Sequence, residues 1–211
     1  MYNPSIKIKL EAIDLPIPEK LKTLLMQKEG TVTTAEANEA GVSNERLRLL
    51  VKSGELERAA FGVYILPDEL ADKMFIAQLR RPKIIYSHET ALFLHDLTDR
   101  DPLSYTVTVP AGYNIAQLRK EGFTVFSVAR ELHDLGVTKL TTMFGHTVIV
   151  YGLERTICDC IRSRNRMDIA VVTDAVKRYV LRKDKDLYTL MKMSETFGVS
   201  KMIRSYMELL L

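Results

Sequence analysis

The order of patterns in residues 31–66 constrains the fold of this chain more than any other feature of the sequence. Thr33 is followed three positions later by Glu36, a spacing typical of a capping box at the start of a helix, and this helix is expected to end at Gly41. Gly41 can adopt the left-handed conformation that ends a helix, and Ser43 is a favourable N-cap for the next one. Two helices joined by such a short turn predict a helix-turn-helix.

The second of these helices, NERLRLLVKSG, is followed by a pattern of two strands. Leu47, Leu50 and Val51 share one face of the helix, which we expect to be buried, while Glu45, Arg48, Leu49 and Lys52 face away from it. The residues ELERAAFGVYIL then fit two short strands joined by a tight turn at residues 60–62. A further helical pattern at residues 18–30 precedes these elements, so the sequence predicts a winged helix-turn-helix over residues 18–66.

Beyond residue 68 the chain alternates between short strands and helices. The strand patterns are KIIYS, SYTVTVP, FTVFSV, VTKLTTMF and HTVIVYG, and helices are expected near residues 68–80, 88–97, 114–121 and 153–211. We therefore predict an α+β protein with two domains. Residues 1–68 form a winged helix-turn-helix domain, in which SIKIKLEAIDL adds a strand, and residues 69–211 form a mixed α/β domain that ends in a helical group.

Composition and charge fit an ordinary globular protein. Hydrophobic residues make up 46% of the chain, and no apolar run approaches the ~18 residues of a membrane span, so we expect a cytoplasmic protein. Only two cysteines occur, Cys158 and Cys160, and we expect them to pack in the core. Residues 1–70 hold nine Lys/Arg against eleven Asp/Glu, a net charge of −2, whereas the whole chain carries +3. A DNA-binding first domain must therefore focus its positive charge on one face.

Polar and basic side chains gather in the N-terminal half of the predicted recognition helix, the part that enters the major groove in helix-turn-helix proteins. Asn44, Arg46 and Arg48 suit base edges, since asparagine pairs well with adenine and arginine with guanine. Ser43 and Lys52 are better placed for phosphates. The alternative is that these charges merely solvate a domain used for protein contacts. Further candidate DNA contacts are Thr33 and Thr34, with hydroxyls and free amides at the start of the preceding helix, and Arg58 on the wing.

Motifs for catalysis or metal binding are missing from the sequence. His88 and Glu89 would need a histidine at position 92, where Leu92 stands, to complete the zinc motif H-E-x-x-H. No P-loop, G-x-G-x-x-G or G-x-S-x-G occurs, and no acidic residue is followed two positions later by lysine, as in many nucleases. We therefore expect no enzyme activity, metal or cofactor. A DNA-binding enzyme with an unrecognised site remains the alternative.

Basic residues are dense in the helical end of the chain. Such density favours an anionic partner, either additional DNA backbone or an acidic or nucleotide-bearing protein. A solvated helical face, in which aspartates are interspersed, explains the pattern equally well. The candidate surface consists of Arg155, Arg162, Arg164, Arg166, Lys177, Arg178 and Arg182, followed by Lys183 and Lys185.

Three stretches in this order resemble the AbiEi family of antitoxins, and the likeness covers nearly the whole chain. They are TVTTAEANEAGVSNERLRLLVKSGELERAAFGVYIL, YSHETALFLHDLTDRDP and GHTVIVYGLERTICDCI. The first stretch is generic to winged-helix regulators of bacteria, and the other two are more specific. Within these two, Ser87 fits an N-cap and Glu154 suits the positive end of a helix dipole, while the role of Arg155 is left open.

The resemblance implies an antitoxin of a bacterial abortive-infection system, a form of phage defence. Such an antitoxin represses its own toxin–antitoxin operon by binding inverted repeats in the promoter, and its C-terminal domain counters a nucleotidyltransferase toxin, in the type IV manner, without a stable complex. Because one winged helix covers few base pairs, we expect a dimer on double-stranded DNA. By family position, Ser43, Asn44, Arg46 and Arg48 lie on the recognition helix and Arg58 on the wing. The alternative is a direct protein-binding neutraliser that uses the winged helix as a scaffold.

Overall fold

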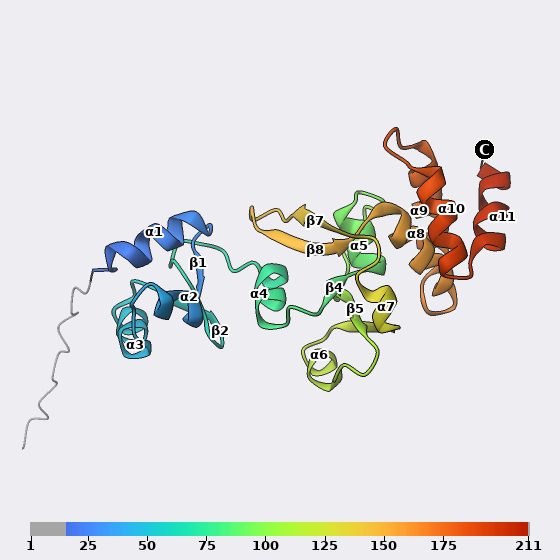
Figure 1. Ribbon diagram of the computed structural model, residues 1–211. Helices are drawn as coiled ribbons and strands as arrows, with labels where there is room; N and C mark the ends of the chain where they lie inside the picture. Colours follow the sequence, from blue (N-terminus) through green and yellow to red (C-terminus); the bar gives the residue numbers. More distant parts are fainter. Residues whose placement is uncertain (1–15, 211) are drawn as a thin grey trace, which may run out of the picture. The chain divides into compact units, whose positions relative to one another are not determined.

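The computed structural model describes residues 16–210, with only the backbone given for residues 209 and 210. The strand expected in SIKIKLEAIDL therefore lies outside the described residues. The chain divides into two compact units, with the division between Ile76 and Ala77 (Figure 1). The predicted α+β class is confirmed, with the small winged unit first and a helical group at the end. The functional boundary at residues 68 and 69 stays a prediction.

Three helices and a small sheet make up the first unit. The sheet has the order β1-β3-β2 with both pairings antiparallel, and its last two strands form the predicted wing. The first strand was not predicted, because three residues between two helices are too short to show a period. The elements are α1 (Glu19–Gln27), β1 (Thr31–Thr33), α2 (Thr34–Glu39), α3 (Asn44–Ser53), β2 (Glu57–Ala60) and β3 (Val63–Ile65).

The capping box predicted at the start of α2 is present and is extended by an ion pair. Thr33 and Glu36 exchange both capping hydrogen bonds. The Glu36 carboxylate also pairs with the Lys28 ammonium just after α1, so one carboxylate ties two helices together. Burial alone would raise the pKa of Glu36, but its bonds to Lys28 and Thr33 lower it overall. Beneath these bonds, buried residues from all three helices form one core, including Leu21, Leu25, Ala37, Leu47 and Leu50.

A five-stranded mixed sheet forms the centre of the second unit. The strands are β4 (Ile85–Tyr86), β5 (Thr106–Pro110), β6 (Thr124–Val128), β7 (Val137–Thr141) and β8 (Thr147–Tyr151), in the order β6-β5-β4-β8-β7. Strand β5 runs parallel to β6, β4 runs parallel to β8, and the other two pairings are antiparallel. All five strands fall within the strand patterns of the sequence.

Helix α4 (Lys73–Arg80) contains the division between the units and is shorter than the predicted helix at 68–80. The prediction was wrong about its start, because the Asp72 carboxylate accepts hydrogen bonds from the amides of Met74 and Phe75 and so caps the helix there. The short helix α7 (Arg130–His133) was not predicted. The remaining predicted helices are present as α5 (His88–Leu94), α6 (Ala116–Lys120), α8 (Leu153–Arg162), the 3-10 helix η1 (Arg164–Arg166), α9 (Ile169–Leu181), α10 (Leu187–Thr196) and α11 (Ser200–Leu210).

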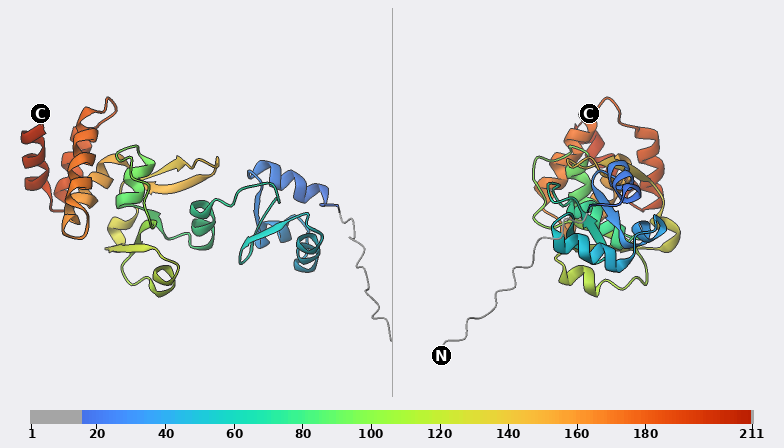
Figure 2. Two further views of the ribbon diagram at one scale, coloured as in Figure 1. Left: turned by 180° about the vertical axis from the view of Figure 1, so that it is seen from behind. Right: turned by 90° about the vertical axis from the view of Figure 1, so that its left-hand side faces the viewer.

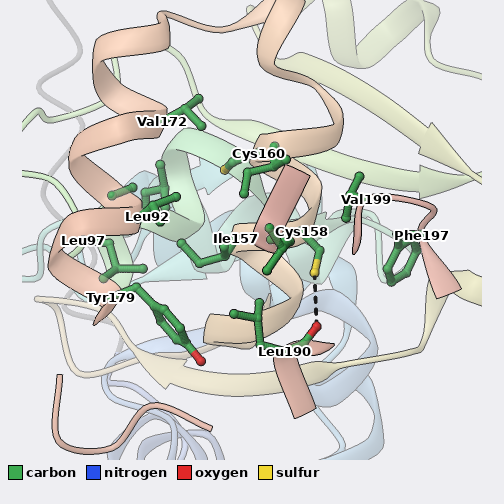
Figure 3. Close-up of a cluster of buried hydrophobic side chains, with 14 of the residues drawn as sticks. Leu92, Leu97, Ile157, Cys158, Cys160, Val172, Tyr179, Leu190, Phe197 and Val199 are labelled. Atoms are coloured by element: carbon green, nitrogen blue, oxygen red, sulfur yellow. Dashed lines mark hydrogen bonds between the residues drawn. The ribbon is translucent and has the colours of Figure 1, made fainter. Parts of the chain in front are cut away.

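Helices α8 to α11 gather at the C-terminal end of the second unit and share one apolar core (Figure 2). Ile157 of α8, Val172 of α9 and Leu190 of α10 meet there with side chains that are at least 99% buried (Figure 3). Both cysteines are buried free thiols in this cluster, and Cys158 Sγ lies 3.9 Å from the Leu190 carbonyl oxygen. The prediction that they pack in the core is confirmed.

Arg155 lies inside this unit and not on a surface, which corrects its assignment to a surface for an anionic partner. Its side chain is fully buried, with the guanidinium carbon 4.0 Å from the ring centroids of both Tyr151 and Phe197. Its Nε donates to Asp159 Oδ2 at 2.8 Å, and its Nη1 donates to the carbonyls of Leu132 and Leu135. Burial raises the pKa of Asp159, and the nearby cations oppose this shift. Arg155 therefore joins the sheet, the α7 region and the helical group.

We expect Arg155→Met to lower the free energy of unfolding by about 3–5 kcal/mol, because it leaves the buried Asp159 carboxylate without its main partner. Lys177→Met is the matched control, since Lys177 is exposed on α9 and should change stability by less than about 0.5 kcal/mol. Urea unfolding of the full chain, followed by circular dichroism, measures both variants. Equal, small decreases in the free energy of unfolding of the two variants would show that the buried pair of Arg155 and Asp159 contributes little to stability.

Candidate nucleic-acid interface

Helix α3 is positioned by its N-cap and by its buried face. Ser43 Oγ accepts a hydrogen bond from the Arg46 amide at 3.2 Å, and Leu47 and Leu50 have no exposed surface. Because the helix has 3.6 residues per turn, the opposite face turns outward. This exposed face carries Asn44, Glu45, Arg48 and Lys52. The prediction is confirmed for the buried Leu47 and Leu50 and for the exposed Glu45, Arg48 and Lys52, whereas Val51, expected to be buried, and Leu49, expected to face outward, are both half-buried.

Arg48, the first candidate for reading guanine, is paired with its neighbour Glu45. Two parallel hydrogen bonds join them, Nη2 to Oε1 at 2.8 Å and Nε to Oε2 at 3.1 Å. The hydrogen bond and charge of Arg48 lower the pKa of Glu45. Both side chains are exposed, by 71% and 64%, so water competes with the pair and holds its strength to the level of a surface ion pair. Glu45 thus occupies two of the five N–H donors of Arg48, and a base contact through Nε and Nη2 requires Arg48 to release this partner.

Arg46 also has a partner within its own domain. Its Nη2 donates to the Pro16 carbonyl at 3.0 Å, and the side chain is half-buried. Asn44 and Lys52, in contrast, are exposed and make no side-chain hydrogen bond to the part of the chain that the structure describes. These two residues are the immediately available polar groups on α3.

The wing adds an aromatic residue that the sequence analysis did not select. Phe61 lies in the turn between β2 and β3 and is 79% exposed. The guanidinium carbon of Arg58 lies 5.1 Å from the centroid of its ring, within reach of a cation–π contact. The position of Phe61 in the tight turn was the available signal, because a large apolar side chain there cannot be buried by the hairpin itself.

Thr33 and Thr34 do not present free amides, which corrects that part of the prediction. The Thr33 amide donates to Glu36 Oε2 at 2.8 Å, and the Thr34 amide donates to the Gly62 carbonyl at 2.9 Å. The Thr33 hydroxyl is likewise engaged with Glu36. The backbone here holds the domain together, so a phosphate contact would depend on the half-buried Thr34 side chain.

Most basic residues of the helical end have partners inside the second unit. Arg178 pairs with Asp99 and Asp174, and Arg182 pairs with Asp184. The paired aspartates cancel much of the positive charge, as expected if this part of the chain is a solvated helical face.

The other members of this basic group differ in what they contact. Arg162 lies 3.3 Å from Asp159, and Arg166 lies over the ring of Phe126 at 4.1 Å. Arg164 is half-buried and donates to the Ile161 carbonyl, whereas Lys177 is exposed. The surface proposed from sequence is therefore interrupted by ion pairs, and its role stays a prediction.

The second specific stretch, YSHETALFLHDLTDRDP, surrounds a buried histidine. His88 follows Ser87, the N-cap position of α5, and has a left-handed backbone with φ +49°. Its ring stacks on Phe126 at 3.6 Å, and its Nδ1 and Nε2 lie 3.0 Å from the hydroxyl oxygens of Ser87 and Ser163. The Ser87 hydroxyl accepts from Thr108 and does not cap the helix, so the prediction of a side-chain cap was wrong.

Burial keeps His88 neutral in the folded protein. Its pKa is lowered to about 3, first by burial and then by three arginines around it. A strained backbone, a stacked ring and two hydroxyl contacts fix the residue between α5, β6 and the end of α8. The Glu154 carboxylate, at the start of α8, accepts hydrogen bonds from the Tyr179 hydroxyl and the Asp186 amide, which agrees with the structural role expected for it.

Because the unfolded chain protonates His88 near pH 6.5 and the folded protein does not, its contribution to stability is complete above that pH. We expect the free energy of unfolding to fall between pH 6.5 and about 3, by up to about 1.4 kcal/mol per pH unit. His88→Asn removes the titration, and asparagine tolerates the left-handed backbone. Urea unfolding at several pH values should show that the free energy of unfolding of this variant changes less with pH than that of the unsubstituted protein. The same pH dependence in both proteins would contradict the expectation.

Within residues 16–210, no group of three or more histidine, cysteine or acidic side chains could hold a metal ion. In the same part of the chain, no helix combines the length and apolar character that a membrane crossing requires.

Comparison with known proteins identifies the first unit. Residues 19–67 match the model of a family described as "Transcriptional regulator, AbiEi antitoxin". No curated protein matches the chain. Among solved structures, the crystal structure of the RV2827C protein from Mycobacterium tuberculosis is similar, with a TM-score of 0.55 and 13% identity, over 92% of this chain and 82% of that one. At this identity the likeness shows a shared fold. Residues 19–67 therefore form a domain of the AbiEi antitoxin family of transcriptional regulators, and the resemblance seen in the sequence is confirmed there.

Proposed function

We propose that this chain is a cytoplasmic antitoxin that represses its own toxin–antitoxin operon by binding inverted repeats in the promoter as a dimer. The observation that carries the proposal is the exposed face of α3, where Asn44, Arg48 and Lys52 lie opposite the fully buried leucines. The wing adds exposed Arg58 and Phe61. A polar helix face and a wing with an exposed arginine are the parts with which winged helices contact the major groove and the adjacent backbone.

In this proposal, each exposed residue of α3 contacts the part of DNA that suits its chemistry. Asn44 is suited to adenine and Arg48 to guanine, whereas the Lys52 ammonium is a point charge suited to phosphate. Arg46 supports the helix through its bond to Pro16 and can reach DNA only after that bond is released.

The pair between Glu45 and Arg48 favours sequence selectivity. Water competes with an exposed ion pair, so the bond between Glu45 and Arg48 is weak, whereas a bidentate arginine contact with guanine is a main source of base discrimination. Glu45 is therefore readily exchanged for a well-matched guanine, but exchange for a single phosphate replaces one carboxylate-like partner by another and gains little. Glu45 also repels the DNA backbone, which further weakens binding to random sequence.

We expect Arg48→Ala to weaken binding to the DNA upstream of the gene by about tenfold or more, with little effect on random DNA. Lys52→Ala should weaken binding to both DNAs. It should also reduce the slope of affinity against salt concentration by about the contribution of one phosphate contact. Glu45→Gln should strengthen binding to random DNA and so lower the specificity ratio. Fluorescence anisotropy at several salt concentrations measures these effects, with Lys192→Ala, at an exposed lysine of α10, as control. Equal effects of the three substitutions on both DNAs would rule out groove reading by α3.

The antitoxin activity is proposed to reside in the second unit, where it counters a nucleotidyltransferase toxin without a stable complex. The support is that this unit has its own sheet and its own core, independent of the winged unit. The exposed Arg166 and Lys177 and the half-buried Arg164 are basic groups there that an anionic partner could contact.

We expect the double substitution Arg46→Ala and Arg48→Ala to abolish repression of the promoter and to leave protection from the toxin intact. The two arginines lie in the first unit, so the fold of the second should be unaffected. Cell survival on toxin induction, with the antitoxin expressed from an unrelated promoter, is compared with a promoter reporter. Loss of both activities in a folded and abundant protein would show that antitoxicity requires DNA binding.

A further inference from the structure

A recess of about 510 Å³ lies at the carboxyl ends of the parallel strands β5 and β6, within the second unit. The chain leaving β5 at Pro110 forms one wall, with Tyr113 and Asn114, and α7, which follows β6, forms another. Crevices at the carboxyl ends of parallel strands are common ligand sites in α/β folds. The volume fits a small organic ligand and greatly exceeds that of a lone inorganic anion.

Two cations of the recess have donors available. Arg130 donates from Nε to the Ala111 carbonyl at 3.1 Å, which fixes the guanidinium over the loop. Its two terminal nitrogens make no hydrogen bond to any described residue, and the ammonium of the exposed Lys83 is equally unengaged. A planar guanidinium held in this way can contact two phosphate oxygens at once. The acidic side chain on the rim is Asp134, so positive charge is in excess.

The loop after β5 is shaped for this guanidinium. Gly112 has φ +85°, and a β-carbon there would lie 3.2 Å from Arg130 Nη2. Glycine suits this position because other residues are strained in this backbone conformation and would crowd the arginine head. The Ala111 amide donates to the Val128 carbonyl at 2.7 Å, which joins the loop to the end of β6. The arginine is thus held by the fold before any ligand arrives.

The remaining lining residues suit an aromatic and hydrogen-bonding ligand. Tyr113 is half-buried and presents a ring, and the Asn114 side-chain oxygen accepts from the Ala116 amide, which leaves its amide hydrogens as donors. His133 lines the recess and is 7% exposed; its Nδ1 lies 3.1 Å from Asp134, and its buried Nε2 has no partner among the described residues.

We propose that this recess binds a nucleoside monophosphate. Arg130 and Lys83 hold the phosphate, the Tyr113 ring stacks on the base, and Asn114 hydrogen-bonds to the sugar or the base edge. The inference goes beyond the proposed regulation of an operon and is independent of it, because every lining residue belongs to the second unit.

The test is calorimetric titration of the full chain with AMP, GMP, CMP and UMP, and with adenosine and inorganic phosphate as partial ligands. At least one nucleotide should bind at a ratio of one to one, and both partial ligands should bind about tenfold more weakly or worse. A single-stranded oligonucleotide without a terminal phosphate is the additional probe. Absence of nucleotide binding, phosphate binding as tight as nucleotide binding, or binding of the oligonucleotide alone would each overturn the proposal.

Variants assign the binding to this recess. Lys83→Gln should weaken nucleotide binding about fivefold to tenfold, and Arg130→Gln by more, because an ionic hydrogen bond is lost in each case. Tyr113→Ala should reduce nucleotide binding but leave phosphate binding unchanged. Lys120→Gln, at an exposed lysine of α6 that does not line the recess, is the matched control and should have no effect. Equal losses from Lys83→Gln and Lys120→Gln would contradict the assignment, and unchanged DNA binding by these variants would separate the recess from the winged helix.

Discussion

The second unit depends on one buried cation. Arg155 lies between the rings of Tyr151 and Phe197, pairs with Asp159 and bonds to carbonyls near α7, so four parts of the unit meet at one guanidinium. Arginine suits this position because its flat, delocalised charge stacks on aromatic rings and still donates hydrogen bonds in plane. A hydrophobic residue could fill the space, but it would not specify how the helices meet the sheet.

The first unit has its charges in the opposite setting, on an exposed helix face. There, Glu45 is paired with Arg48, the arginine proposed to read a base, within a domain whose net charge is negative. Such an arrangement gives little general attraction to a polyanion and leaves binding to depend on a few well-matched contacts. This resolves the tension between the acidic composition of residues 1–70 and the proposed DNA binding.

Local patterns made much of the fold predictable. The Thr33–Glu36 box, the Ser43 cap and the leucine stripe of α3 depend on spacing along the chain, and each is present. The partners of individual side chains were harder to predict, because they depend on residues distant in sequence. Arg155 looks like any surface arginine until it is placed between two rings, and the bond from Arg46 to Pro16 joins residues 30 positions apart. The recess after β5 needed the pairing of β5 with β6, which no local pattern gives.

The pair of Glu45 and Arg48 has a consequence for how such a regulator searches a genome. A chromosome offers about a million or more competing sites, and a strongly cationic domain spends most of its time on them. Under the proposed function, a recognition helix whose arginine is paired with Glu45 would leave random DNA sooner, at a modest cost in affinity for the operator. Few copies of the protein per cell would then be needed to occupy one promoter, and a small fall in their number would release it.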